Sequence, residues 1–99
     1  MTNETVDIKA LFSKKKARQN KRLEIFRRIL VKCHDRIKIV SQLEQTYCTF
    51  VIPRIIVGMP MYKLEDCRKY LVSKLKKNGF QVEIQKEDEI YISWEHHDI

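Results

Sequence analysis

The first 52 residues contain neither glycine nor proline, and their apolar residues recur at helical spacing. From Leu23 to Val40 the steps between these residues alternate between three and four, which places them on one stripe of an α-helix. Residues 7–43 are therefore predicted to be helical, either as one long helix or as two helices with a slight break. The stripe consists of Leu23, Phe26, Leu30, Cys33, Ile37 and Val40.

The period changes to two at Tyr47, where the sequence YCTFVI alternates in the manner of a strand and stops at Pro53. Apolar residues then return to helical spacing from Leu64 to Leu75, and Asn78-Gly79 is a typical helix end. Residues 80–84 and 90–94 alternate on either side of a polar KED turn, which predicts a hairpin.

These patterns predict an α+β fold in a single domain of 99 residues. A long N-terminal basic helix, or helix pair, precedes a β-α-β-β unit in which one helix covers a three-stranded sheet. We divide the chain into a flexible N-terminus (1–6), a basic amphipathic helical segment (7–43), the β-α-β-β unit (44–94) and a tail (95–99).

The charge of the chain is concentrated in its N-terminal third. Residues 9–38 hold twelve Lys and Arg against Glu24 and Asp35, whereas residues 39–99 hold eight bases and nine acids. This asymmetry favours an anionic partner for the helical segment. At 100° per residue, one sector more than a quarter turn from the apolar stripe holds Lys14, Arg18, Lys21, Arg28, Lys32 and Arg36.

Such a row of cations can neutralise phosphates along a duplex without reading its sequence. The predicted interface for DNA or RNA consists of Lys14, Lys15, Arg18, Lys21, Arg22, Arg28, Lys32 and Arg36. A solvated helix face and a protein contact are the alternative interpretations. In the second of these, Leu23, Phe26, Leu30, Ile37 and Val40 form a seam to other proteins or to a second copy, with the apolar loop 55–61 in the contact.

No residue pattern indicates an enzyme, a cofactor or a metal site. Cys33-His34 and His96-His97 lack metal-ligand spacing, and Cys48 and Cys67 lie on apolar faces where a thiol is inert. The three cysteines fit no disulfide framework, and the polar N-terminus and the lack of a long apolar run predict a protein that is neither secreted nor membrane-bound.

Several short motifs occur together in the second half: Cys48 and Pro53 in the strand, GMPMY at 58–62, NGF at 78–80 and ISW at 92–94. With LEIFRRILVKCHDRIK upstream, they resemble a small uncharacterised protein family of the nucleocytoplasmic large DNA viruses, over roughly residues 7–94. The resemblance implies a viral protein of the host cytoplasm, viral factory or virion, and it supplies no catalytic residue.

One departure from that family concerns the start of the second helix. Lys63 occupies a position where the family favours Asp, and a lysine cannot accept the N–H groups of the first turn. The resemblance therefore leaves the start of this helix open.

Overall fold

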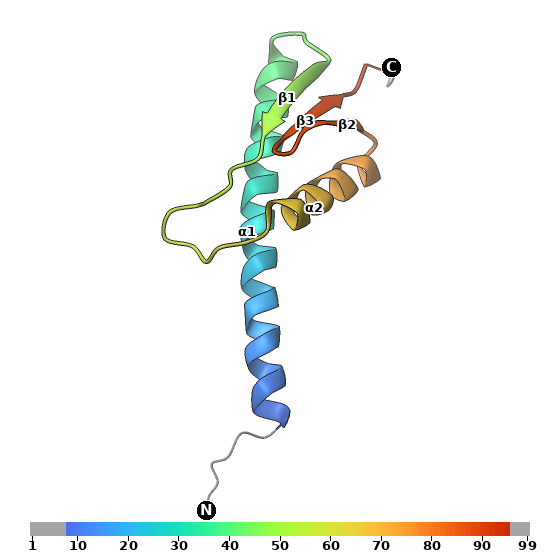
Figure 1. Cartoon of the computed structure of the whole chain (residues 1–99). Helices are drawn as coiled ribbons and strands as arrows, with labels where there is room; N and C mark the ends of the chain where they lie inside the picture. Colours follow the sequence, from blue (N-terminus) through green and yellow to red (C-terminus); the bar gives the residue numbers. More distant parts are fainter. Residues whose placement is uncertain (1–7, 96–99) are drawn as a thin grey trace, which may run out of the picture.

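The computed structural model describes residues 8–95, with their side chains from Asn20 onward. Its elements are α1 (Ile8–Gln42), β1 (Tyr47–Val51), α2 (Leu64–Lys77), β2 (Gln81–Lys86) and β3 (Glu89–Ser93), as Figure 1 shows. The predicted α+β class and the order of elements are confirmed, and α1 is one continuous helix of 35 residues. The predicted flexible segment 1–6 and residues 96–99 of the predicted tail lie outside the described residues.

The three strands form one sheet in the order β1-β3-β2, and β3 is antiparallel to both neighbours. Cys48 and Val82 both face Ile92 across the ladders, and Phe50 and Ile84 both face Ile90. Because side chains alternate along a strand, these residues share one face of the sheet. The core lies on this face.

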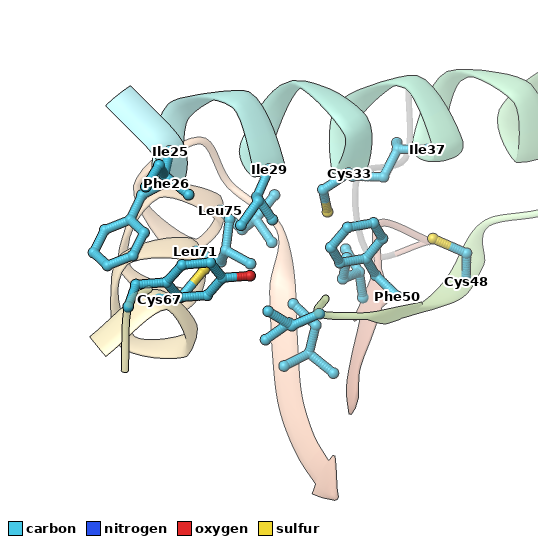
Figure 2. Packing of buried hydrophobic residues seen from close by; sticks show 14 of the residues in the cluster. Ile25, Phe26, Ile29, Cys33, Ile37, Cys48, Phe50, Cys67, Leu71 and Leu75 are labelled. Atoms are coloured by element: carbon cyan, nitrogen blue, oxygen red, sulfur yellow. The ribbon is translucent and has the colours of Figure 1, made fainter. Parts of the chain in front are cut away.

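Both helices, rather than α2 alone, cover that face. The fully buried side chains of α1 include Ile25, Ile29 and Cys33, and those of α2 are Cys67, Leu71 and Leu75. Figure 2 shows the labelled α1 side chains pointing toward α2 and toward Phe50 of β1. The long helix therefore supplies one wall of the only large cluster of buried apolar residues described here.

The buried face of α1 differs from the predicted stripe. Ile25 and Ile29 are completely buried, whereas Leu23 is 38% exposed and Leu30 is partly buried. A helix that packs on a globular core buries an apolar face at least about 100° wide, and not the narrow seam of a coiled coil. Here α1 contacts α2 and β1 together, so its buried face is rotated toward Ile25 and Ile29.

The ends of α2 follow from local chemistry. Lys63 is the N-cap and makes no capping side-chain hydrogen bond, but Glu65 and Asp66 place negative charge in the first turn. At the other end, Gly79 has a φ of 98°, the N–H of Phe80 donates to the carbonyl of Leu75 and the N–H of Gly79 donates to that of Lys76. This Schellman motif confirms the predicted helix end.

The molecule is elongated, measuring 67 × 26 × 22 Å. Its radius of gyration of 17.9 Å exceeds the roughly 13 Å expected of a compact domain of about 100 residues. Figure 1 shows the cause, since the N-terminal part of α1 extends well past α2 and the sheet. Neither of the described helices combines the length and the apolar character needed to span a membrane.

Candidate nucleic-acid interface

The helix α1 has a projecting half and a packed half. Among the side chains that the structure describes, Ile25 is the first to be buried, and residues 20–24 are all exposed. The helical backbone begins at Ile8, so residues 8–24 cover about 25 Å at roughly 1.5 Å per residue. We call residues 8–24 the projecting half and residues 25–42 the packed half.

Positive charge covers both halves of α1. The projecting half contains seven Lys and Arg and one acid, Glu24, and the packed half contains five Lys and Arg and one acid, Asp35. Within one helix the net charge is therefore +10. Charge of one sign at this density attracts a polyanion over a distance set by the ionic strength.

The predicted cations do not all have the same surroundings. The side chains of Lys14, Lys15 and Arg18 lie outside those that the structure describes. Lys21, Arg22 and Lys32 are exposed, and no ion pair to a described residue involves them.

Two of the predicted cations are already engaged within the chain. Arg28 forms an ion pair with Glu24 one turn earlier, with Nη2 and Oε1 3.0 Å apart and both side chains more than half exposed. Arg36 donates from Nε to the main-chain oxygen of Thr49 on β1 at 2.7 Å. The Arg28 pair is a weak surface interaction, whereas Arg36 connects α1 to the edge of the sheet.

The cation row borders the packed face of α1 more closely than the sequence predicted. At about 100° per residue, Arg36 projects between the buried residues Ile25 and Ile29. The predicted separation of more than a quarter turn is therefore wrong in the packed half, because the buried face is rotated toward the row. In this half, a polyanion would lie against α1 beside the domain.

A cavity of about 330 Å³ lies where α1 leaves the domain, lined by Arg22, Leu23, Phe26 and Asp66. Arg22 is one of the predicted cations, and the cavity places it near the first turn of α2. The carboxylate of Asp66 gives this position mixed charge, so we expect Arg22 to contribute less to anion binding than Lys21.

The predicted partner seam is mostly part of the chain's own core. Phe26, Ile37 and Val40 are buried against the sheet and α2, and the ring of Phe26 packs edge-to-face on Tyr62 with centroids 5.8 Å apart. Leu23 and Leu30 are the two seam residues that are not buried. In this fold a second chain could not use the whole stripe.

The apolar loop 55–61 is half buried and half exposed. Ile56 and Met59 pack against the core, whereas Val57 is 96% exposed and Ile55 and Met61 are also exposed. The base of the loop is fixed, because the Tyr62 hydroxyl donates to the carbonyl of Pro53. Part of the loop therefore belongs to the core, and only the exposed part could take up the predicted protein contact.

The thiols are poor nucleophiles at neutral pH. Burial raises the pKa of Cys33 to about 12, with a smaller contribution of the same sign from Cys48 and an opposing one from Arg36. Burial also raises the pKa of Cys67 to about 12 and raises that of Cys48. All three are free thiols.

Metal-ligating side chains do not gather in the part of the chain that the structure describes, where no group of three or more His, Cys, Asp or Glu could hold an ion. His96 and His97, which were considered as metal ligands from the sequence, lie outside that part. The far face of the sheet instead carries aromatic rings, with Tyr47 stacked on Tyr91 at 5.9 Å between centroids. Phe50 of β1 lies on the opposite face and is buried in the core.

The sequence interpretation missed Ile25 and Ile29 because the coiled-coil template was applied to a helix that packs on a small domain. Both isoleucines were visible as a second apolar row beside the stripe. It also missed that Arg36 binds β1. No sequence signal could have indicated that contact, because it depends on where β1 lies beside α1.

A family profile matches most of the chain. No curated protein and no solved structure matches the chain. The family profile described as "Family of unknown function (DUF5759)" matches residues 6–76, which is well over half of the chain and includes α1, β1 and most of α2. The protein therefore belongs to this family of unknown function, DUF5759.

Proposed function

We propose that the protein binds nucleic acid nonspecifically through α1 and has no enzymatic activity. The observation that supports this function best is a continuous 35-residue helix of net charge +10. Its projecting half extends past α2 and the sheet (Figure 1). A chain that required only solubility could have mixed acids among these bases, as it does after residue 39.

The mechanism is counterion release from a phosphate backbone. Lys21, Lys32 and the cations of the same sector can each replace condensed counterions, which favours binding at low salt. The row carries no information about base sequence, because Lys and Arg on phosphates position a duplex without reading base edges. Aromatic residues do not alternate with these cations, so stacking on single-stranded bases is not part of the proposal.

We further propose that the protein belongs to a large DNA virus of eukaryotes and acts in the virion, or in a nucleoprotein assembly of the host cytoplasm or viral factory. This context rests on the motifs in the strand, in GMPMY, in NGF and in ISW. In this setting the β-α-β-β unit would hold α1 in an assembly with other viral proteins.

A mobility-shift titration of a labelled duplex tests the function. Replacing Lys14, Arg18, Lys21 and Arg28 by Gln should weaken binding by about 100-fold, since each exposed charge contact contributes up to about 1 kcal/mol. A matched control replaces Lys63, Lys76, Lys77 and Lys86 by Gln, which removes the same charge from exposed positions outside α1. Equal weakening by both variants, or no binding by the wild type, would overturn the proposal.

The structure also offers an observation in favour of a second function, a structural adaptor without nucleic acid. The side chains of Ile55, Val57 and Met61 are exposed on a loop whose base is fixed, and they offer apolar surface for a contact. Sedimentation of the purified chain tests this candidate. Self-association that disappears with Val57→Asp would support it, and a monomer at high concentration would count against the homo-oligomeric form.

A further inference from the structure

The two outer edges of the sheet differ in how their main-chain groups are used. In the β1–β3 ladder the N–H of Trp94 donates to Thr46 and the N–H of Ile52 donates to Asp88. Antiparallel pairs alternate between hydrogen-bonded and non-bonded, so Ile90 and Ile92 direct their main-chain groups toward β1. The β2–β3 ladder must then use Tyr91 and Ser93.

This alternation determines which groups of β2 are free. Glu83 and Gln81 pair with Tyr91 and Ser93, so the N–H and C=O groups of Val82 and Ile84 point away from the sheet. On the opposite edge, Arg36 already covers the outward carbonyl of Thr49. No described residue covers Val82 or Ile84 in the same way.

A groove lies next to this free edge, on the helix-covered side of the sheet. It has a volume of about 250 Å³ and runs between α2 and β2. Ile84 belongs to the face that forms the core, yet it is 58% exposed because α2 does not reach over the edge. The groove is lined by Arg68, Lys69, Val72, Ser73 and Ile84.

The charge of this groove selects among possible occupants. Arg68 donates from Nη1 to the carbonyl of Glu87, while its buried Nε has no acceptor among the described residues. Lys69 forms an ion pair with Glu65 one turn earlier on α2. If a second copy paired its β2 with this β2, two grooves lined by Arg68 and Lys69 would come together. The Glu83 carboxylates of the two copies would also lie in the same ladder, so like charges would repel. An acidic strand would be attracted by Arg68 and Lys69.

We propose that the β2 edge is a docking site for an extended acidic peptide of a partner protein, which adds to the sheet as a fourth strand. Main-chain hydrogen bonds to Val82 and Ile84 hold the peptide, and an apolar side chain lies between Val72 and Ile84. Acidic residues two positions before and after that side chain lie on the same face, toward Arg68 and Lys69. The site is independent of α1 and does not rest on the proposed nucleic-acid binding.

The probe is the capped peptide Thr-Glu-Thr-Val-Thr-Glu-Thr, with a matched peptide that has Lys in place of Glu. Titration into the isotope-labelled full chain should shift the amide resonances of Val82 and Ile84 and leave those of Thr49 and Val51 on the β1 edge unchanged. The Glu peptide should bind at least about tenfold more tightly than the Lys peptide, because two charge contacts change sign.

Two further variants separate docking from other effects. Ile84→Pro removes an outward N–H without breaking the β2–β3 ladder and should abolish the shifts. If this variant does not fold, the Glu peptide N-methylated at its valine gives the same test from the ligand side, because it lacks a donor. Neutralising Lys14, Arg18, Lys21 and Arg28 should leave the peptide titration unchanged.

Several results would overturn the proposal. These are an absence of shifts at Val82 and Ile84 at millimolar peptide, equal binding of the Glu and Lys peptides, and shifts confined to α1. A dimer in sedimentation that Ile84→Pro dissociates would assign the edge to a second copy instead.

Discussion

The two halves of α1 have one continuous backbone and similar charge, but different surroundings. In the packed half, Ile25, Ile29 and Cys33 are buried between α2 and the sheet, and Arg36 binds the main chain of β1. In the projecting half, residues 20–24 are exposed, and the only ion pair described there joins Glu24 to Arg28. The comparison shows that an arginine of the packed half stabilises the fold, whereas Lys21 and Arg22 of the projecting half are exposed.

The largest difference between the halves should appear in stability. Ile29→Ala leaves a cavity among α2 and the sheet and should lower the free energy of unfolding by about 2–5 kcal/mol. Lys21→Ala in the projecting half should change it by no more than about 0.5 kcal/mol. Urea unfolding measures both, and equal losses would mean that the projecting half is packed as well.

The buried thiols make the free energy of unfolding depend on pH in the alkaline range. Cys33 and Cys67 each have a pKa raised from 9.0 to about 12 by burial, so above pH 9 the unfolded chain releases protons that the folded chain keeps. Stability should be unaffected by these groups below pH 9 and should fall above it by about 1.4 kcal/mol per pH unit for each thiol. A Cys33→Ala, Cys67→Ala double variant should lose this part of the slope in unfolding measured from pH 7 to 11. An unchanged slope would contradict the assignment.

Substitutions of Arg36 and Lys32 compare a cation that is bound to β1 with one that is free of ion pairs among the described residues. Arg36→Gln should lower the free energy of unfolding by about 1 kcal/mol, because the hydrogen bond to Thr49 is lost. Lys32→Gln should leave stability unchanged but weaken duplex binding more than Arg36→Gln does. If Arg36→Gln weakens binding as much as Lys32→Gln, the contact with Thr49 does not withdraw Arg36 from the interface.

The smallest effect concerns Glu24, the only acid of the projecting half. Glu24→Gln removes the ion pair with Arg28 and should lower stability by about 0.3–0.5 kcal/mol. The same change should strengthen duplex binding at low salt by roughly twofold to fivefold, since it frees a cation and removes an anion. We therefore expect lower stability together with higher duplex affinity. A decrease in both would show that binding depends on the stability of the helix.

Local patterns were sufficient to predict most of the elements. The Asn78-Gly79 signal fixed the end of α2, and the alternation in YCTFVI fixed β1, because each depends on neighbours within a few residues. The strand order and the rotation of α1 depend on contacts between distant segments. For that reason the predicted apolar stripe contained Leu23, which is exposed, and not Ile25, which is buried.

The candidate interface was predictable in composition and not in detail. The excess of Lys and Arg in residues 9–38 is visible in the sequence, and α1 is a single helix that carries all of them. The contact between Arg36 and Thr49, and the free edge at Val82 and Ile84, arise only once β1, β3 and β2 are placed in order.

The central claim is that α1 binds phosphate backbones through its cations. The most direct test is the salt dependence of duplex affinity, measured by fluorescence anisotropy from 50 to 200 mM salt. The account predicts a linear fall of the logarithm of affinity with the logarithm of salt, with a slope of about −0.9 per phosphate contacted. Neutralising Lys14, Arg18, Lys21 and Arg28 should flatten the slope by about 3 to 4 units. A slope near zero, or one that these four changes leave unaltered, would contradict it.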